Sequence, residues 1–394
     1  MKKSRIIGFL VLLFLLYGIY FYYTNLRGAW FAFGPPDKDV TDPIVLSTIL
    51  PPPGYAIEIF ADGVPSARVM ARDQFGNFWV SQTGEGTISH LIVEEGRVVG
   101  KTLVFRNLRK PHGLAFDPDD PAILYIAEQD KISRVRIYSD ERMEKIIDLP
   151  PGEHHITRTI GFGPDKRLYV SIGSSCNVCI EEDQHLAKIF SMDKEGKDFK
   201  EFARGLRNTV FFTWDEWGRM WATEMGRDFL GDDLPPDEIN SIEEGRNYGW
   251  PICYGKNIHD DQFDTNTYIR NPCMEPFEAG SVIDIPAHSA PLGLALVPND
   301  PDFPSEWWGD LVVSYHGSWN KTEPTGYKIV RFDLDEDGRY LGTVSDFITG
   351  WLGPEGVIGR PVDLLFADDG LYTDSGLYIS DDKGGVIYRM FKIQ

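Results

Sequence analysis

The stretch TVFFTWDEWGRMWATEM, from Thr209 to Met225, contains the pattern that decides the fold. An apolar, aromatic segment is followed by a turn containing Asp and Gly, and then by a second apolar segment that ends in polar residues. Short aromatic and β-branched runs bounded by such turn residues are typical of β-strands. The stretch therefore predicts two strands joined by a tight turn.

The same strand–turn–strand pattern occurs six times along the chain. The other copies begin at Ala67 (ARVMARDQFGNFWVSQ), Gly113 (GLAFDPDDPAILYIAEQ), Thr159 (TIGFGPDKRLYVSIG), Gly293 (GLALVPND with GDLVVSYHG) and Val362 (VDLLFADDG with SGLYISDDKG). The early copies lie about 45 residues apart, and repeats of this period are typical of β-propellers. We therefore predict an all-β, six-bladed β-propeller over residues 54–394.

Composition and the absence of some motifs exclude several functional classes. Helical patterns are few, and no glycine-rich phosphate loop opens a helix, which disfavours a nicotinamide or ATP enzyme. The chain has 39 basic and 60 acidic residues, for a formal net charge of -21. Such a charge argues against nucleic acid as a partner.

The N-terminal sequence predicts a membrane anchor. Lys2, Lys3 and Arg5 precede an uncharged run from Ile6 to Tyr23, which as a helix is just long enough for a bilayer core of about 30 Å. No small-residue cleavage site follows, so we expect residues 1–30 to form an uncleaved transmembrane helix rather than a removed signal peptide. The positive-inside rule predicts a single-pass cell-membrane protein whose propeller faces the periplasm or the cell exterior.

Residues 31–53 are proline-rich and predict a linker between anchor and propeller. Cysteine usage agrees with export, because four cysteines in an exported chain suggest two disulfides. Cys176 and Cys179 form one close pair, and Cys253 and Cys273 are the others. The CNVC spacing also suits zinc, which is the alternative for the first pair.

Residues just before the first strand of each repeat share one position relative to the propeller axis. The innermost strand of each blade starts at one rim of the central channel, so these residues converge there. The set is Arg68, His112, His154 with His155, Arg207 with Asn208, His288, and Arg360. It predicts a cationic channel mouth that suits an anionic ligand, beside imidazoles that can act as bases.

A second group of candidates lies between Ala222 and Gly255, in ATEMGRDFLGDDLPPDEINSIEEGRNYGWPICYG. Its Gly/Pro-rich loop carries the acidic residues Asp228, Asp232, Asp233, Asp237 and Glu238. Carboxylates and backbone carbonyls of irregular loops bind Ca²⁺. The spacing is not that of an EF-hand, and a solvated acidic loop is the alternative.

Several of these segments together resemble the quinoprotein glucose/sorbosone dehydrogenase family. The matching motifs are HHITRTIGFGPDKRLYVSIGSSCNVC, GLRNTVFFTW, GRDFLGDDLPPDEIN, NYGWPICYG, AHSAPLGLAL, HGSWNKTEPTGYKIVRF and GRPVDLLF. They span roughly residues 53–394. Because it contains the HGSWN motif, the chain resembles the sorbosone-dehydrogenase-like branch of the family. The resemblance implies a sugar dehydrogenase that uses pyrroloquinoline quinone (PQQ) and Ca²⁺.

The resemblance also implies roles for individual residues. His155 matches the general base, which removes the sugar hydroxyl proton while hydride passes from the C1 carbon to PQQ. Arg207 and Asn208 in GLRN and Arg360 in GRP match cofactor-binding positions. His112 in KPHGLAF stands where soluble glucose dehydrogenases carry a glutamine-containing loop, and it is a further cofactor-binding candidate.

The metal ligands follow from the same resemblance. The carbonyls of Gly226 and Arg227 match those that hold the Ca²⁺ beside the quinone. Glu238 and the carbonyl of Tyr248 match a second, structural calcium site.

One more cofactor contact and the electron acceptor complete the expectations. Three residues, His316, Lys321 and Lys328, lie near the position of a cofactor-binding lysine in the family, and we assign Lys328. No CxxCH haem motif occurs, so electrons would leave to an external acceptor, a membrane quinone or a cytochrome.

Two other functions are compatible with the predicted fold. A calcium-dependent propeller lactonase would activate water at a channel metal, but such a site favours carboxylate and asparagine ligands over the His and Arg found here. A non-catalytic propeller that displays a binding surface would account for the fold but not for the shared position of these residues.

Overall fold

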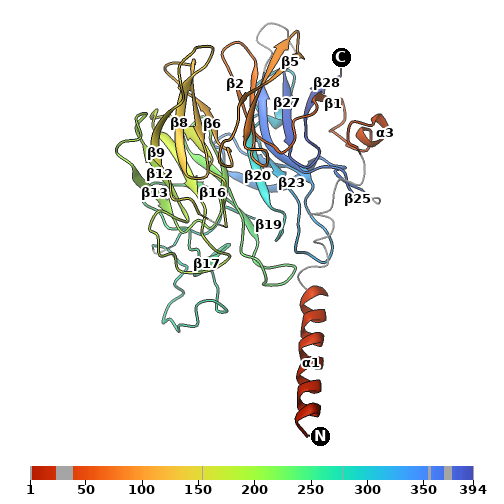
Figure 1. The fold of residues 1–394 in the computed structure, drawn as a ribbon, viewed down its shortest axis with the longest axis vertical. Helices are drawn as coiled ribbons and strands as arrows, with labels where there is room; N and C mark the ends of the chain where they lie inside the picture. The colour runs from red at the N-terminus through yellow and green to blue at the C-terminus, as the bar shows by residue number, and fades with distance from the viewer. Residues whose placement is uncertain are drawn as a thin grey trace.

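Six antiparallel sheets of four strands each form the body of the protein in the computed structural model (Figure 1). The structure describes residues 2–23, 39–152, 154–276, 278–353, 356–367 and 375–393. Each sheet is called a blade here and is numbered in chain order. The six blades confirm the predicted number of repeats.

The strand bounds show one recurring arrangement. Blade 1 contains β2 (Ala67–Arg72), β3 (Phe78–Gln82), β4 (Thr87–Glu94) and β5 (Arg97–Phe105). Blade 2 contains β6 (Leu114–Phe116), β7 (Ile123–Ala127), β8 (Lys131–Arg136) and β9 (Glu144–Asp148). Blade 3 contains β10 (Ile160–Phe162), β11 (Leu168–Ile172), β12 (Lys188–Met192) and β13 (Lys200–Arg204).

The last three blades carry the insertions and the closure. Blade 4 contains β14 (Thr209–Trp214), β15 (Met220–Glu224), β16 (Asp237–Ile242) and β19 (Ile283–Ile285). Blade 5 contains β20 (Pro291–Leu296), β21 (Leu311–Tyr315), β22 (Lys328–Leu334) and β23 (Tyr340–Ile348). Blade 6 contains β26 (Pro361–Ala367), β27 (Gly376–Asp381), β28 (Val386–Lys392) and β1 (Tyr55–Ala61).

The ring is closed by backbone pairing between the two ends of the propeller sequence. Strand β1 pairs antiparallel with β28, from Tyr55 opposite Lys392 to Ala61 opposite Ile387. Neighbouring blades contact each other around the circle, β2 with β6, β6 with β10, β11 with β14, β14 with β20, β20 with β26 and β26 with β2. The innermost strands therefore surround one axis.

Burial along the strands follows from this packing. Every residue of β3, β11, β15 and β21 is buried, because these strands lie between two neighbouring blades. The outer strand β5 alternates between exposed and half-buried residues, as expected for a strand with one face in solvent. Because both faces of these strands are buried, their apolar residues follow one another instead of alternating with polar ones. This matches the short apolar segments of the sequence repeats.

A single aspartate fixes the turn between the first two strands of blade 4. The Asp215 carboxylate accepts hydrogen bonds from the backbone N–H groups of Trp217 (3.0 Å) and Arg219 (2.9 Å) and from Nε1 of Trp221 (3.1 Å). In blade 1, Asp73 makes the same three types of bond, to Phe75, Asn77 and Trp79. The Asp and Gly turns of the sequence repeat are therefore tied to the aromatic core.

The remaining elements are short. They are α3 (Pro43–Leu46), η2 (Ser305–Trp307), the hairpin of β17 (Cys253–Tyr254) and β18 (Ile258–His259), and the pair β24 (Leu352–Gly353) and β25 (Gly356–Val357). Both predicted disulfides form, Cys176–Cys179 and Cys253–Cys273, so the CNVC cysteines hold no thiolate for zinc. Disulfides suit an oxidising compartment, and the location outside the cytoplasm stays a prediction.

The predicted transmembrane anchor is not supported. Helix α1 (Lys2–Phe21) is the element that corresponds to the predicted anchor. Within the described part of the chain, no helix combines the length and the apolarity that a membrane crossing requires. The predicted linker lies mostly outside the described residues, because 24–38 are not among them.

Replacing Asp215 by alanine should destabilise the fold. The change leaves two backbone N–H groups and the indole N–H of buried Trp221 without their acceptor, and we expect a loss of about 2–4 kcal/mol in the free energy of unfolding. Denaturant unfolding followed by tryptophan fluorescence measures it. The neighbouring, exposed Glu216 offers a matched control, since Glu216→Ala should change the unfolding free energy by less than about 0.5 kcal/mol. Equal effects of the two variants would contradict this role of Asp215.

Candidate active site

A cavity of about 320 Å³ lies where blades 3, 4 and 5 begin. Five residues of the predicted channel mouth line it: His154, His155, Arg207, Asn208 and His288. They lie in the segments before β10, β14 and β20, the innermost strands of these blades. Residues that share this position in the repeat therefore converge, as predicted, in three of the six blades.

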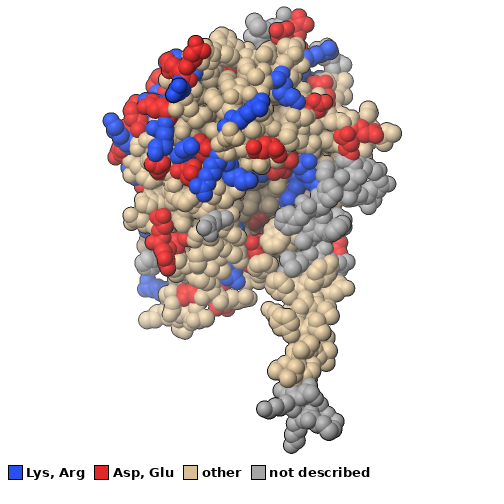
Figure 2. Space-filling model, viewed as in Figure 1, with Lys and Arg blue, Asp and Glu red and all other residues tan. Residues whose placement is uncertain are grey.

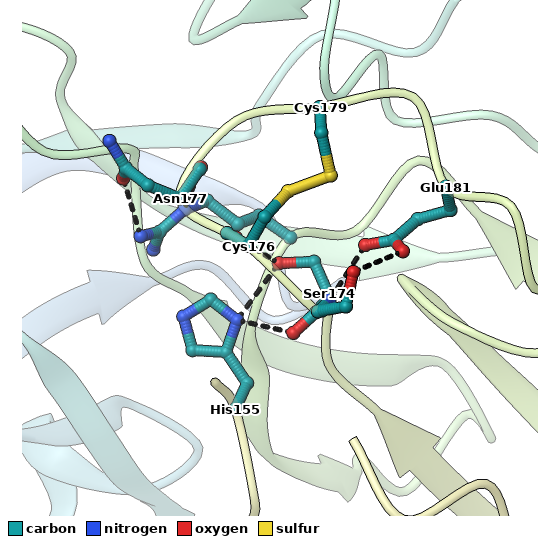
Figure 3. The surroundings of a disulfide bond; sticks show 8 residues. His155, Ser174, Cys176, Asn177, Cys179 and Glu181 are labelled. Atoms are coloured by element: carbon teal, nitrogen blue, oxygen red, sulfur yellow. Dashed lines mark hydrogen bonds between the residues drawn. A yellow bond between two sulfur atoms is a disulfide. The ribbon is translucent and has the colours of Figure 1, made fainter. Parts of the chain in front are cut away.

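His155 is held in one orientation by Ser174, the second residue after the end of β11. Its Nδ1 lies 3.0 Å from the Ser174 carbonyl and 2.8 Å from Ser174 Oγ, and that hydroxyl donates in turn to the Cys176 carbonyl (Figure 3). A carbonyl only accepts hydrogen bonds, so Nδ1 carries the proton and Nε2 keeps a lone pair. Nε2 has no hydrogen-bond partner among the described residues.

The surroundings of His155 keep its ring neutral. Burial, the Arg207 guanidinium and the neighbouring His154 hold the pKa of His155 well below its usual value. The two histidine rings meet edge to face with their centres 4.5 Å apart. His154 is more exposed than His155, and burial and Arg207 lower its pKa as well. A neutral imidazole with one free nitrogen therefore faces the cavity.

Arg207 is buried and held by the loop that the first disulfide closes. Its Nε donates to the Asn177 carbonyl at 2.8 Å, and its Nη2 donates to Asn177 Oδ1 at 2.9 Å and to Asp228 at 3.3 Å. Nη1 donates to the Met225 carbonyl at 3.3 Å, and its second hydrogen has no acceptor among the described residues. Asn177 lies between Cys176 and Cys179, so this loop positions the guanidinium (Figure 3).

Two carboxylates of the acidic loop line the cavity, although the repeat position itself predicted no acid there. Asp228 accepts from Arg207 and, at 2.7 Å, from Asn320 Nδ2. Asp237 is buried and accepts from the backbone N–H groups of Gly226 (2.8 Å) and Ala290 (2.9 Å). Burial raises the pKa of Asp237 to about 7. The cavity thus combines one paired arginine with a carboxyl group that titrates near neutrality.

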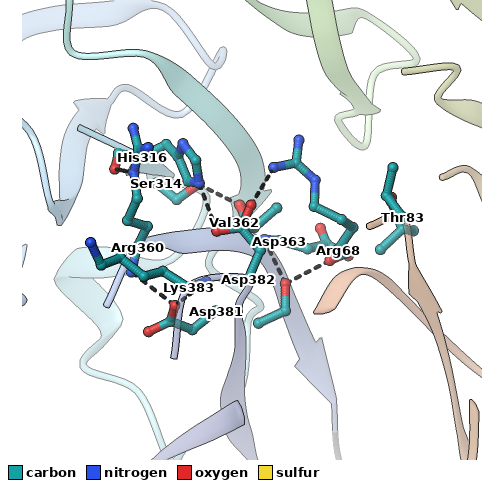
Figure 4. Close-up of polar contacts among 12 residues, drawn as sticks. Arg68, Thr83, Ser314, His316, Arg360, Val362, Asp363, Asp381, Asp382 and Lys383 are labelled. Atoms are coloured by element: carbon teal, nitrogen blue, oxygen red, sulfur yellow. Dashed lines mark hydrogen bonds and ion pairs between the residues drawn. The ribbon is translucent and has the colours of Figure 1, made fainter. Parts of the chain in front are cut away.

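The arginines of blades 1 and 6 lie in a separate polar cluster (Figure 4). Arg68 pairs with Asp382 at 2.8 Å, and His316 Nε2 lies 2.9 Å from the same carboxylate. Although burial opposes ionisation, His316 and Arg68 hold the pKa of Asp382 well below its usual value. Arg360 donates to the carbonyls of His316 and Gly317. Arg360 therefore borders this cluster and does not line the cavity that contains His155.

The two remaining cofactor candidates lie elsewhere. His112 is fully buried, with Nε2 at 3.1 Å from Thr159 Oγ1 and its ring against Phe211. Lys328 begins β22 and pairs with Asp346 at 2.5 Å. Neither side chain lines the cavity of His155, and no contact in the described residues tests their predicted roles.

The four predicted metal-binding residues surround a smaller cavity of about 20 Å³ next to the first. Glu238 accepts from the Gly255 N–H (2.6 Å) and from Asn240 Nδ2 (2.9 Å), and burial raises its pKa to about 6. Tyr248 lines the same space, and Arg227 pairs with Asp260 at 3.2 Å. Gly226 lies on the wall that separates the two cavities. The four residues therefore lie close together, and their roles as calcium ligands stay predictions.

Two further residues of the cavity, Trp319 and Asn320, were missed by the sequence argument, and Asp237 was named only as an acidic candidate for calcium binding. Asp237 starts β16, and Trp319 and Asn320 follow β21, so none precedes a first strand. Asn177 and Ser174 hold the site from outside the cavity. Trp319 and Asn320 belong to HGSWN, and a search of each repeat for polar residues after its second strand would have found them.

The TrAA12-like family model matches residues 50–346 of the chain. An uncharacterised protein of Borreliella burgdorferi is 31% identical over 367 residues, which cover 88% of this chain and 92% of that protein. A pyrroloquinoline quinone-dependent pyranose dehydrogenase of Coprinopsis cinerea is 22% identical over 85% of this chain. This chain spans 53% of that enzyme's length.

Solved structures with the same fold come from this group of proteins. A Trichoderma reesei enzyme of carbohydrate-active family AA12 has a TM-score of 0.76 at 19% identity, covering 88% of this chain and 98% of that one. The holo PQQ domain of the Coprinopsis cinerea pyranose dehydrogenase has a TM-score of 0.72 at 19% identity, covering 87% and 97%.

A PQQ-bound aldose sugar dehydrogenase of Streptomyces coelicolor has a TM-score of 0.61 at 20% identity, covering 88% of this chain and 100% of that one. Identities this low show the common fold only. The family model, in contrast, matches most of the propeller, including the residues from His154 to Asn320 that line the cavity. The chain belongs to the TrAA12-like family.

Proposed function

We propose that this protein is a PQQ- and calcium-dependent sugar dehydrogenase that passes electrons to an external acceptor. The observation that carries the proposal is the position of His155, whose Nδ1 is fixed by Ser174 and which lines the cavity beside Arg207 and Asn208, with Nε2 unbonded among the described residues. PQQ-dependent oxidation of a sugar needs such a base. The names of the similar Coprinopsis cinerea and Streptomyces coelicolor enzymes support the cofactor and the substrate class.

The residues of the cavity fit a planar, anionic cofactor. A volume of about 320 Å³ lies in the range of small-molecule sites, and Trp319 offers an aromatic wall. Among the described residues, Asn208 Nδ2 has only the Met225 sulfur as acceptor, at 3.4 Å, and thioether sulfur is a weak acceptor. Together with the spare hydrogen on Arg207 Nη1, this amide is available for the carboxylates or carbonyls of PQQ.

The residues proposed to hold calcium line the small cavity beside the first. The carbonyls of Gly226 and Arg227 would hold the ion beside the quinone, and Glu238 with the carbonyl of Tyr248 would hold a second, structural ion. Glu224 lines the same cavity, and burial raises its pKa to about 8, whereas the pKa of Glu238 is raised only to about 6, so Glu238 is mainly ionised at neutral pH. A bound dication would favour the charged forms of both carboxyl groups.

The chemistry divides between the cofactor and the chain. When bound, PQQ supplies the hydride acceptor, and Ca²⁺ polarises the accepting carbonyl. His155 Nε2 accepts the proton of the sugar hydroxyl, because its neutral form is favoured by burial and by Arg207. Ser174 fixes the tautomer, and Arg207 with Asn208 orients the anionic ligand. The electron acceptor is a separate molecule.

Dye reduction by assorted aldoses tests the function directly. The purified protein is supplied with PQQ and Ca²⁺, and we expect sugar-dependent reduction that disappears when either is left out. Hydrolysis of lactones without PQQ would instead favour the lactonase. Neither activity, together with no PQQ binding, would favour a non-catalytic propeller.

Replacing His155 by alanine should lower kcat by about 10²–10⁴-fold while PQQ still binds. The loss follows from removing the group that accepts the hydroxyl proton. Cofactor titration and steady-state dye reduction measure the two effects separately. His154→Ala is the matched control and should lower kcat much less, because His154 makes no hydrogen bond to Ser174 among the described residues. Lost PQQ binding with normal turnover after reconstitution would contradict the role of His155 as base.

The pH dependence of kcat/KM follows from the pKa of His155. The base must be neutral, and its pKa is held below the usual value, about 6.5, by burial, Arg207 and His154. Activity should therefore persist as the pH falls through 6.5 and decline only at lower pH. Asp237 titrates separately near 7, so the profile is also recorded for Asp237→Asn. An acid limb at or above pH 6.5 in both proteins would contradict the assignment.

A further inference from the structure

A second pocket, of about 450 Å³, lies between the end of α1 and the loop that follows β15. It is called the aromatic pocket here, and its walls include Tyr17, Tyr20, Phe21, Phe229, Gln262 and Thr322. Tyr17, Tyr20 and Phe229 are exposed. Aromatic rings that are open to solvent and gathered around one hollow are unusual on a monomeric surface and mark a binding site for an apolar or aromatic partner.

The aromatic pocket shares a wall with the active site. The ring of Phe21 lies 5.4 Å from that of Phe229, which meets the ring of Trp319 edge to face at 5.9 Å. Trp319 lines the cavity of His155, and Phe229 lines the aromatic pocket. A molecule in the aromatic pocket is therefore separated from the active site by this pair of aromatic side chains.

The wall is held in place on both sides. On the side of the active site, Asp228 contacts Arg207 and Asn320, and His288 Nε2 lies 2.7 Å from the Gly231 carbonyl. On the other side, Asp232 accepts from the Thr322 N–H at 3.0 Å. Thr322 Oγ1 donates to the Tyr23 carbonyl at 2.8 Å, which ties the end of α1 to the same loop. The loop from Asp228 to Asp232 thus contributes to both sites.

The lining selects a class of ligand. Aromatic rings suit a planar, uncharged ring, and Gln262 can donate hydrogen bonds to carbonyl oxygens at its edge. The described side chains of α1 carry no charge, whereas the propeller surface in Figure 2 carries charges of both signs. Asp232 of the loop also lines the pocket, and its carboxylate disfavours an anionic ligand. A hollow of this size can accommodate a small molecule, while docking of a carrier protein generally requires a surface above about 1,000 Å² in total. The pocket therefore favours a small organic acceptor.

We propose that the aromatic pocket binds a quinone, which serves as the electron acceptor of the enzyme. This inference rests on the proposed function. Oxidation of one sugar hydroxyl to the carbonyl level releases two electrons and two protons. One quinone takes up the two electrons and the two protons. Its two carbonyl oxygens become hydroxyl groups, and it leaves as the hydroquinone. All four cysteines are paired in disulfides, so no cysteine thiol relays the electrons.

Quinone binding and quinone reduction by the full-length chain test the proposal. Calorimetry measures the affinity for a tail-free dimethoxy-methyl-benzoquinone and for its decyl derivative, in the absence of sugar. Phe21→Ala should weaken binding of both by at least about tenfold, which corresponds to about 1.4 kcal/mol. In steady-state assays it should raise KM for the quinone by a similar factor. Ferricyanide, which needs no aromatic site, should be reduced at the wild-type rate.

Phe14→Ala is the matched control, because Phe14 is an exposed phenylalanine of the same helix that does not line the pocket. It should leave quinone binding and reduction unchanged. Equal effects of the two variants, or binding of the decyl derivative alone, would mean adsorption of the tail to α1 and would overturn the proposal. Sugar-dependent ferricyanide reduction with quinone reduction insensitive to Phe21→Ala would also overturn it. No sugar-dependent reduction of any acceptor would instead refute the proposed function.

Discussion

Backbone pairing between β1 and β28 closes the propeller, and the active site depends on this closure. The pairing joins residues from the two ends of the propeller sequence in one blade, from Tyr55 opposite Lys392 to Ala61 opposite Ile387. With the ring closed, the innermost strands of all six blades surround one axis. Segments that are far apart in the sequence, such as those around His155 and His288, then meet in a single cavity.

Hydrogen bonds turn this meeting point into a site with fixed geometry. Ser174 bonds to the ring of His155 through its side chain and carbonyl, and its N–H donates to the Arg207 carbonyl at 2.8 Å. Asn177, in the loop of the first disulfide, holds the guanidinium of Arg207 and the backbone of Asp228. The base and the ligand-binding arginine are therefore parts of one network, so each constrains the position of the other.

Electrostatics distinguish the cavity from the rest of this acidic protein. At the surface, carboxylates pair with lysines and arginines or are solvated, whereas the residues around the cavity are removed from water. Burial favours the neutral form of His155 and raises the pKa of Asp237, Glu224 and Glu238. A bound cation would favour the charged forms of the three carboxyl groups.

The sequence repeat predicted the blades and the residues that precede their first strands, because those segments have a period that can be read directly. It predicted the position of His155, Arg207 and Asn208 for this reason. The same rule included His112, which instead bonds to Thr159 and packs against Phe211 inside the ring. Whether a side chain at the rim is exposed depends on how neighbouring blades tilt and pack. The position of a residue within the sequence repeat does not contain this information.

Other parts of the structure have no local signal. Strand β1 is separated from its partner β28 by almost the whole propeller sequence, so ring closure could not be inferred from adjacent residues. Trp319 and Asn320 enter the cavity from the loop after β21, and Asp237 enters it from the start of β16, where the loop after β15 ends; the lengths of these loops differ between blades. At the N-terminus, the uncharged run predicted a membrane span, whereas no helix in the described part of the chain has the length and apolarity that a crossing requires.

A crystal structure of the protein grown with PQQ and Ca²⁺ tests the central claim most directly. The account predicts PQQ in the cavity lined by Arg207, Asn208 and Trp319, with its reactive carbonyl next to His155 Nε2. It also predicts a metal ion beside the backbone of Gly226. PQQ bound elsewhere, or no PQQ bound at concentrations that saturate related enzymes, would contradict the account.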